Sequence, residues 1–295
     1  MRLVIVANVN KPKVRPALDE LVPWIKQRAD VIGIDTDEQH VELDQLELDA
    51  TLVLGGDGTL LSTARRLKGK RVPVMGVNFG RLGFLASFTP AQFKEHFENF
   101  VAGKLPISAR TTIEASVVDV EHRIDLMDDH AVTAHRRFHS RALNDAVISA
   151  GPPFRMVELT LGSERDPGVQ VAGDGLIIAT PSGSTAYNVA AGGPIISPNI
   201  DALCITPLSP QSLSFRPVVH DAKSRITVVA KRVNRGTTLS CDGQESTILK
   251  QGDRIVIRRS PHDVLLAENP DAHEWRTLAE KLNWAATPRY NAGGK

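Results

Sequence analysis

The sequence predicts an α/β domain, then a mostly β domain, and a final helix that returns to the first domain. Over roughly the first hundred residues, short apolar runs alternate with segments of helical periodicity, which is typical of a parallel sheet covered by helices. After Lys104 the runs are short and β-rich, and helical periodicity nearly disappears. We therefore place a Rossmann-like domain at 1–104 and a β-rich, β-sandwich-like domain at 105–271, and we expect 272–295 to pack back on the first domain.

The first domain is expected to contain four strands and three helices. Buried strands are predicted from apolar runs at 3–7, 31–34, 51–54 and 72–77. Apolar residues at helical spacing predict helices at 14–28, 60–67 and 92–101. Pro23 lies inside the first of these, where proline favours a kink or an early end.

The second domain is expected to be built from short strands separated by turn residues. The predicted strands lie at 113–120, 141–149, 156–161, 175–179, 225–229, 237–241 and 254–257. The polar stretch 121–139 is expected to be a solvated hairpin loop, because its histidines do not match a metal-ligand spacing. Trp275, Leu278, Ala279 and Leu282 recur at helical spacing and predict the final helix.

Composition excludes several classes of protein. The formal net charge of the 295 residues is +1, so no strong overall field favours nucleic acid or acidic lipid. The longest apolar stretch, 72–88, is interrupted by Asn78 and Arg81 and is not expected to span a membrane. The apolar run at the N-terminus is too short for a signal peptide, so we expect a cytoplasmic protein. Cys204 and Cys241 lie in predicted strands and are expected to be buried, reduced thiols.

The segment GGDGT at 55–59 is the first candidate for chemistry. It follows an apolar strand and opens a helix, which is where open parallel sheets bind ligands. Glycines allow the backbone to approach a phosphate at a helix N-terminus. Asp57 would be repelled by that phosphate unless it accepts a proton from an attacking hydroxyl or helps to hold Mg²⁺. The alternative is a tight turn in which Asp57 or Thr59 caps the helix, and spacing alone does not decide between them.

Two further segments carry polar side chains between apolar runs. Asn144 and Asp145 lie in a predicted strand and need partners for their amide and carboxylate. A nucleotide supplies such partners, although taken alone the pair favours a turn at the end of a strand. The segment TPSGSTAY at 180–187 has five hydroxyl residues in eight positions, and Gly183 permits close approach of its backbone. Because apolar segments flank it, a phosphate-, ribose- or base-binding loop is favoured over a polar connection.

Taken together, these segments resemble the NAD kinases. GGDGTLL, LND and DGLIIATPSGSTAYNVAAGGPIISP look like segments of that family, in the same order. Further matches are GVNFGRLGFLA at 76–86, LSFRPVV at 213–219, CDGQ at 241–244 and EWRTLAEKLNW at 274–284. The resemblance covers nearly the whole chain. GGDGT alone is shared with lipid kinases and phosphofructokinases, whereas the TPSGSTAY block and the colinear set are highly specific.

The resemblance implies transfer of the γ-phosphate of ATP to the adenosine 2′-hydroxyl of NAD, with Mg²⁺ or another divalent cation. Asp57 would be the general base, Asn144 and Asp145 would hold adenine and ribose, and Asp174 would bind the far end of the dinucleotide. The implied nucleotide-binding residues are Asp57, Gly58, Phe79, Asn144, Asp145, Arg155, Asp174, Ser182, Thr185, Ala186, Tyr187, Asn188, Val189, Ala190 and Gln244. A homodimer or homotetramer joined through the β-rich domain is also implied.

The chain departs from the family pattern at three positions. Asp145 stands where the family usually has glutamate, so its reach to the ribose is shorter by one methylene. Gln211 replaces a histidine that is common before the LSFRP segment, and Ala172 replaces an arginine of some relatives. One alternative is a lipid kinase, against which the TPSGSTAY segment argues. The other is an NAD-binding regulator without catalysis, which Asp145 favours and Asp57 opposes.

Overall fold

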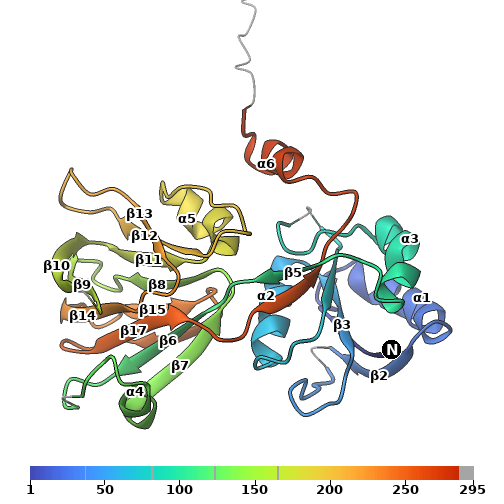
Figure 1. Cartoon of the computed structure of the whole chain (residues 1–295), viewed down its shortest axis with the longest axis horizontal. Helices are drawn as coiled ribbons and strands as arrows, with labels where there is room; N and C mark the ends of the chain where they lie inside the picture. The colour runs from blue at the N-terminus through green and yellow to red at the C-terminus, as the bar shows by residue number, and fades with distance from the viewer. Residues whose placement is uncertain (37, 81–82, 123, 165, 286–295) are drawn as a thin grey trace, which may run out of the picture.

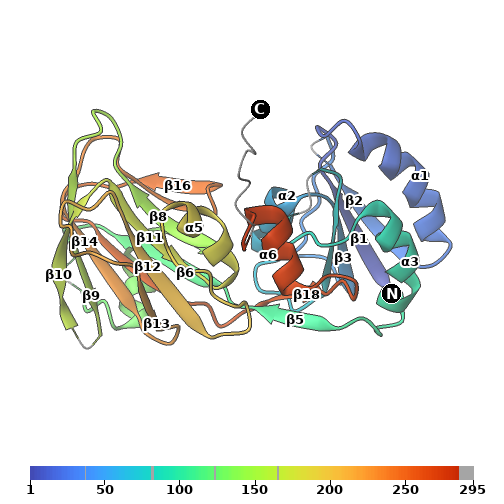
Figure 2. The ribbon, with the colours of Figure 1, turned by 90° about the horizontal axis from the view of Figure 1, so that it is seen from above.

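The structure is a computed structural model that describes residues 1–36, 38–80, 83–122, 124–164 and 166–285. Its elements form two domains that lie side by side (Figure 1). The helix α6 (Glu274–Leu282) lies over the space between the domains, which is seen most clearly from above (Figure 2). The predicted α/β and β-rich parts are confirmed, and α6 contacts the first domain through Lys281, whose ammonium lies over the ring of Phe84.

The first domain is a six-stranded sheet with helices on its faces. Its strand order is β2-β1-β3-β4-β18-β5, and β1 to β4 pair in parallel. The strands are β1 (Arg2–Ala7), β2 (Asp30–Asp35), β3 (Ala50–Gly55), β4 (Val74–Asn78), β5 (Ile107–Arg110) and β18 (Val264–Ala267). The helices are α1 (Val14–Lys26), α2 (Asp57–Arg66) and α3 (Pro90–Val101).

Local sequence explains where these helices begin and what they bury. Thr89 caps α3 by accepting from the Gln92 amide, while the Gln92 side chain accepts from the Thr89 amide, a capping box that satisfies two amides without helical partners. Apolar residues at helical spacing face the sheet from both α1 and α3; they are Val14, Leu18, Leu21, Ile25, Phe93, Phe97 and Phe100. The parallel sheet therefore has a covered face, and the carboxyl ends of β3 and β4 meet at one edge.

The second domain is a β-sandwich of two antiparallel six-stranded sheets. Their orders are β10-β9-β14-β17-β6-β7 and β13-β12-β11-β8-β15-β16. The first contains β6 (Ile113–Val118), β7 (Arg136–Ala142), β9 (Val157–Ser163), β10 (Asp166–Gly173), β14 (Ile226–Arg232) and β17 (Arg254–Arg259). The second contains β8 (Asp145–Ser149), β11 (Gly175–Ala179), β12 (Ala202–Leu208), β13 (Val218–Asp221), β15 (Thr238–Cys241) and β16 (Glu245–Ile248). The shared core includes Ile113, Val117, Ile148, Leu159, Leu176, Ile178, Val228, Leu239 and Ile255.

Several details differ from the expectations, and β10, β13 and β16 lie outside the predicted strands. β5 and β18 fall within 105–271 but complete the first sheet, so the two domains are joined by chain that crosses between them twice. The predicted strand 141–149 is the end of β7 and all of β8, separated by a turn. The stretch 121–139 contains α4 (Asp129–His135) and the start of β7 rather than only a loop. Pro23 lies inside α1 without ending it.

Two expectations about composition agree with the fold. Cys204 in β12 and Cys241 in β15 are both buried and free. Burial raises the pKa of the Cys241 thiol to about 12, so this group stays protonated. Within the described parts of the chain, no helix is long and apolar enough to cross a membrane.

Candidate active site

Asp57 is held in place by the loop that follows β4. It is the first residue of α2, directly beyond the carboxyl end of β3. Its carboxylate accepts backbone hydrogen bonds from Phe84 at 2.8 Å, Leu85 at 3.3 Å and Ala86 at 2.9 Å. A carboxylate has about four acceptor positions, so these three bonds fix its orientation and leave room for a further donor. The side chain does not cap α2, which rules out the simple capping interpretation.

Two glycines make this arrangement possible. A Cβ atom at Gly83 would lie 1.8 Å from Oδ1 of Asp57, and one at Gly55 would lie 2.4 Å from Oγ1 of Thr59. Real Cβ atoms do not approach so closely, so any side chain at either position would displace the loop or the helix start. Lys11 donates from Nζ to the carbonyl oxygen of Gly55 at 3.1 Å. The backbone of the glycine-rich segment and of the loop after β4 therefore packs closely around Asp57.

The Asn144–Asp145 turn is organised by a carboxylate from another strand. The Asp242 side chain, just beyond β15, accepts from the backbone amides of Leu143 at 2.9 Å, Asn144 at 2.7 Å and Asp145 at 3.2 Å. In return, the Asp242 amide donates to the carbonyl oxygen of Asp145 at 2.9 Å. These four bonds fix the start of β8 and place the two polar side chains at the end of the sandwich that faces the first domain.

Two carboxyl groups, those of Asp145 and Asp242, are buried or partly buried at this turn, and burial disfavours their ionised forms. Asp145 is 5% exposed, and burial, with a smaller contribution from the charge of Asp242, raises its pKa to about 7. Burial also raises the pKa of Asp242, although the three amides that it accepts act in the opposite direction. A ribose hydroxyl that donates to Asp145 would favour its ionised form.

We expect Asp145→Asn to stabilise the free protein at high pH. The carboxyl pKa is 3.8 when exposed and about 7 when folded, so the folded state holds a proton that the unfolded state has lost. The free energy of unfolding therefore falls as the pH rises from the unfolded pKa of 3.8 to the folded pKa of about 7, and it stays low above that pH. The variant should gain several degrees in Tm at about pH 8 and less at about pH 5, measured by thermal unfolding. Asp19→Asn, which changes an exposed carboxylate, is the control, and an equal gain at both pH values would contradict the assignment.

The 180–187 segment packs directly on this turn. The Thr180 amide donates to the carbonyl oxygen of Asn144 at 2.8 Å, and its hydroxyl donates to the carbonyl oxygen of Leu143 at 2.5 Å. A Cβ atom at Gly183 would lie 2.0 Å from the carbonyl oxygen of Asn144, so this position requires glycine. Ser182–Thr185 forms a 3-10 helix and Tyr187–Ala190 forms the short helix α5. The hydroxyl-rich segment is thus a compact loop at the end of β11.

Members of this loop have different surroundings. Tyr187 is 48% exposed, and its neighbours Ala186, Val189 and Ala190 are partly or fully exposed. The Asn188 side chain is fully buried: it donates to the carbonyl oxygens of Ser184 and Pro194 and accepts from the Thr206 hydroxyl at 2.6 Å. Asn188 therefore shapes the loop from inside, because the hydrogen bonds of its side chain are made within the protein.

Gln244 connects the two domains. Its Nε2 atom donates to the carbonyl oxygen of Gly58 at 2.8 Å, and its Oε1 atom accepts from Arg65 at 2.9 Å. Both partners belong to α2, whereas Gln244 lies between β15 and β16. Phe79, after β4, donates its amide to the carbonyl oxygen of Gly55 at 3.2 Å and is partly buried. The predicted residues Asp57, Gly58, Phe79 and Gln244 are thus brought to one region.

A cavity of about 300 Å³ lies between the domains, and several parts of the chain form its walls. Gly83, Phe84 and Leu85 come from the loop that holds Asp57; Ser182 and Thr185 come from the hydroxyl-rich loop; and Thr277, Leu278 and Lys281 come from α6. A cleft of this size, with mixed apolar and polar walls, is typical of a small-molecule site. Asp57 lies directly behind the Gly83–Leu85 wall.

Arg155 and Asp174 are not brought to this cleft. Both are exposed, and the carbonyl oxygen of Asp174 pairs with the amide of Ala150 at the other end of the sheet. β11 is five residues long and separates Asp174 from the Thr180 loop by roughly 17 Å. Within one chain, Asp174 and the Thr180 loop could therefore contact the same ligand only if that ligand is extended.

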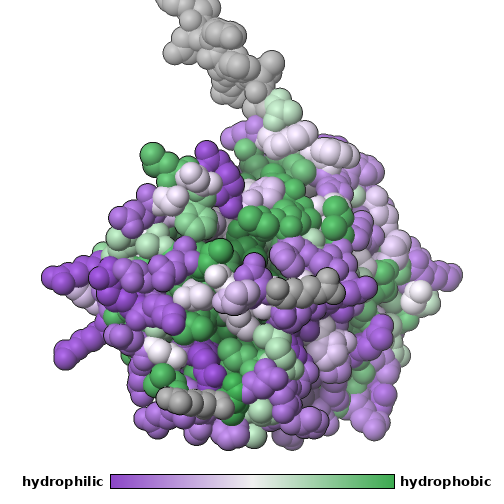
Figure 3. Space-filling view, turned by 60° about the vertical axis from the view of Figure 1, so that its left-hand side comes forward, coloured by the Kyte–Doolittle hydropathy of each residue, from purple (hydrophilic) through white to green (hydrophobic). Residues whose placement is uncertain are grey.

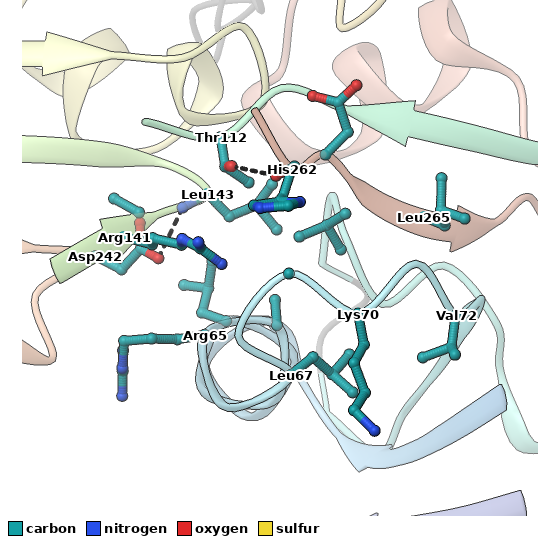
Figure 4. Close-up of a pocket in the computed structure, with 16 residues that line it drawn as sticks. Arg65, Leu67, Lys70, Val72, Thr112, Arg141, Leu143, Asp242, His262 and Leu265 are labelled. Atoms are coloured by element: carbon teal, nitrogen blue, oxygen red, sulfur yellow. Dashed lines mark hydrogen bonds between the residues drawn. The ribbon is translucent and has the colours of Figure 1, made fainter. Parts of the chain in front are cut away.

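A second, much smaller space lies at the domain junction, behind the Asn144 turn (Figure 4). Arg141 and His262 point toward each other there, and the Leu143 amide donates to Asp242 beside them. Both side chains pack on Gly69, where a Cβ would lie 2.8 Å from Arg141 Nη1 and from the His262 ring. The volume of about 20 Å³ has room for a water molecule at most. This is a packed joint between domains rather than a nucleotide site.

Sequence reasoning missed three residues of the site. Asp242 belongs to the CDGQ match, yet only Gln244 was assigned from it, and Gly83 lies in the GVNFGRLGFLA match without an assigned role. Lys281 lies in the final helix, which was expected only to pack. The sequence next to these residues does not indicate their roles, because the residues that they contact lie far away in the chain. Only the matched segments themselves could have drawn attention to them.

Comparison with known proteins agrees with this geometry. The profile of the ATP-NAD kinase N-terminal domain matches residues 3–105, and that of the ATP-NAD kinase C-terminal domain matches 143–268. An NAD kinase of Desulforamulus reducens is 38% identical over 288 residues, which are 94% of this chain and 96% of that protein. An NAD kinase of Geobacter metallireducens is 35% identical over 292 residues, covering 96% and 98%.

Two solved structures share the fold. The yeast NADH kinase complexed with NADH has a TM-score of 0.83 at 23% identity and covers 98% of this chain and 89% of its own. An NAD kinase from Archaeoglobus fulgidus in complex with ATP has a TM-score of 0.70 at 23% identity, covering 96% and 99%. Fold and site together define a two-domain kinase with its cleft between an α/β sheet and a β-sandwich. The chain belongs to the ATP-NAD kinase family and is an enzyme of that class.

Proposed function

We propose that this enzyme transfers the γ-phosphate of ATP to the 2′-hydroxyl of the adenosine ribose of NAD, giving NADP. One observation supports the proposal most strongly. The Asp57 carboxylate is oriented by three amides directly behind a cleft that loops from both domains line. A fixed acceptor at this place can take the proton of a sugar hydroxyl as its oxygen meets the γ-phosphorus.

The other residues would hold the nucleotide so that this hydroxyl faces Asp57. Asn144 offers its amide to adenine and Asp145 its carboxyl group to the ribose, while Ser182 and Thr185 line the cleft. Gln244 ties the β-sandwich to Gly58, so the nucleotide-binding loops keep their position relative to Asp57. Most of the acceleration is expected from such positioning.

A divalent cation fits the donor set if ATP supplies most of its ligands. Among the described residues, one group of three or more potential metal-binding side chains is close enough to share an ion, and its members are Glu95, His96 and Asp271. At the cleft, Asp57 has an acceptor position to spare, and Mg²⁺ is commonly held by one or two carboxylates, water and substrate phosphates. Bound in this way, Mg²⁺ would neutralise charge on the phosphates.

We also propose a homodimer or homotetramer joined through the β-sandwich. β13 is an edge strand, and Val218 and Val219 on it are about half exposed, while Leu213 just before it is 92% exposed. Apolar surface alternates with polar surface on this side of the molecule (Figure 3). Exposed edge strands pair readily with other chains.

The test of the proposed function is NADP formation by the purified enzyme with NAD, ATP and Mg²⁺, read by an NADP-specific dehydrogenase. The second candidate is an NAD-binding regulator, which the shorter Asp145 side chain favours. NAD binding without turnover would support that candidate, and Asp145→Glu would then be the variant to examine for restored activity.

A further inference from the structure

We propose that Lys281 of α6 binds a phosphate group of the nucleotide in the cleft. The final helix would then supply part of the active site instead of only covering it. The inference rests on the proposed kinase function, because that function places phosphate groups near Asp57. The binding experiment described below can nevertheless fail or succeed independently of turnover.

Lys281 lines the cavity next to the loop that holds Asp57. With Thr277 and Leu278, it forms the α6 wall of the cleft. Its Nζ atom lies 4.3 Å from the centroid of the Phe84 ring, and the amide of the same Phe84 donates to Asp57 at 2.8 Å. The ammonium of Lys281 and the carboxylate of Asp57 therefore both contact Phe84, the first through its ring and the second through its amide.

Lys281 forms no ion pair with any described residue of the chain. Among the residues that the structure describes, no carboxylate lies within ion-pair distance of its ammonium, and no hydrogen bond to it is present. Burial lowers the pKa of Lys281, while the charge of Asp57 and, to a smaller extent, that of Glu280 act in the opposite direction. An ammonium has three donors, and in a half-buried position these donors need partners.

Arg110, another cation that lines the cleft, is paired within the protein. Arg110 donates from Nε to the Ser108 hydroxyl at 3.0 Å, and its Nη2 atom lies 3.6 Å from the carboxylate of Glu268. Its charge is therefore already neutralised. Lys281 also lines the cavity, and its donors are available to a ligand.

A phosphate group matches the donors of Lys281 in charge and in number. Lysine binds phosphate as a compact point charge with freely rotating donors, and phosphoryl transfer depends on neutralising negative charge where the reaction takes place. The phosphate could belong to the triphosphate of ATP or to the pyrophosphate of NAD. These share the same chemistry, and kinetics with each nucleotide varied in turn distinguishes them.

The test compares steady-state kinetics of the wild type, Lys281→Ala, Lys281→Arg and Arg276→Ala. Arg276 is an exposed cation on the same helix, paired with Glu280 at 2.8 Å, and serves as the matched control. Loss of a charge-assisted hydrogen bond should lower kcat/KM of Lys281→Ala for one nucleotide about 10- to 100-fold. Lys281→Arg should recover most of this loss, and Arg276→Ala should behave like the wild type. A selective rise in KM for ATP or for NAD identifies the source of the phosphate.

Binding measured without turnover separates this inference from the kinase function. Trp275 and Trp284 flank Lys281, and their rings lie 5.4 Å apart, so tryptophan fluorescence can follow titrations with ATP alone and NAD alone. Lys281→Ala should bind one of them about 10-fold more weakly or worse with an unchanged Tm. Unchanged binding of both nucleotides would overturn the inference. So would a loss that accompanies a lower Tm and that arginine does not restore, because Lys281 would then only pack α6.

Discussion

Asp57→Asn is expected to lower kcat by about 10²- to 10⁴-fold, the usual range for loss of a general base. Asparagine keeps one acceptor oxygen, which can serve the Leu85 and Ala86 amides that share one carboxylate oxygen in the wild type, but it cannot take the proton of the 2′-hydroxyl. The loss should appear in kcat, while the dissociation constant for NAD changes little. Steady-state kinetics and NAD titration on the same preparation measure both.

Two other results of the Asp57→Asn experiment would lead to different conclusions. Turnover close to that of the wild type would show that proton transfer does not pass through Asp57. A lower Tm would instead show that the 84–86 loop had moved, since the three amide bonds fix that loop to the carboxylate. Asp44→Asn, which changes an aspartate paired with Lys68 at 2.8 Å on the surface, is the matched control and should leave kcat unchanged.

Asp242→Ala is expected to damage both stability and nucleotide binding. The substitution leaves the amides of Leu143, Asn144 and Asp145 without their acceptor, and it places alanine at a φ of 53°, a conformation that favours glycine and asparagine. We expect a loss of about 2–4 kcal/mol in the free energy of unfolding, and a rise in KM for NAD of at least about tenfold.

Asp242→Asn should lower stability and NAD binding much less than Asp242→Ala, and comparing the two variants therefore tests the role of the carboxylate. Asparagine tolerates the positive φ and offers one oxygen to the amides, and it removes the negative charge that helps to raise the pKa of Asp145. Urea unfolding and NAD kinetics measure both variants. Glu245→Ala is the control, because its carboxylate is half exposed and lies 3.6 Å from Arg65, where ion pairs contribute little. Equal effects of alanine and asparagine at 242 would contradict the role of Asp242 as the acceptor for these three amides.

Local patterns in the sequence were sufficient to predict most of the fold. Alternating strands and helices place GGDGT at the carboxyl end of β3, and the structure has Asp57 there. The division of 141–149 into two strands was not predicted, because both halves are apolar and β-rich and only the turn at Leu143–Asn144 separates them. The pairing of β18 with β4 joins residues almost two hundred positions apart, and no local periodicity encodes such a contact.

The same reasoning explains which parts of the site were predicted. Asp57, Asn144 and Asp145 belong to short segments whose polar residues interrupt apolar runs, so they are conspicuous. Asp242 acts on amides about a hundred residues earlier in the chain, and Lys281 meets Phe84 only after α6 crosses the cleft. Their roles depend on tertiary structure. Asp174 lies at the end of β11 away from the Thr180 loop, and Arg155 is exposed, so their assignment to the nucleotide stays a prediction of the resemblance.

The most direct test of the proposed reaction is to identify the product and the stoichiometry of a single incubation with NAD, ATP and Mg²⁺. Phosphorus NMR of the reaction mixture distinguishes a 2′-phosphate from other phosphate esters, and ADP is measured in the same sample. We predict a new 2′-phosphomonoester of NAD formed in equal amount to ADP by the wild type, and at least about 100-fold less of it in the same time with Asp57→Asn. ADP released without a phosphorylated dinucleotide, or no ADP despite NAD binding, would contradict the proposed reaction.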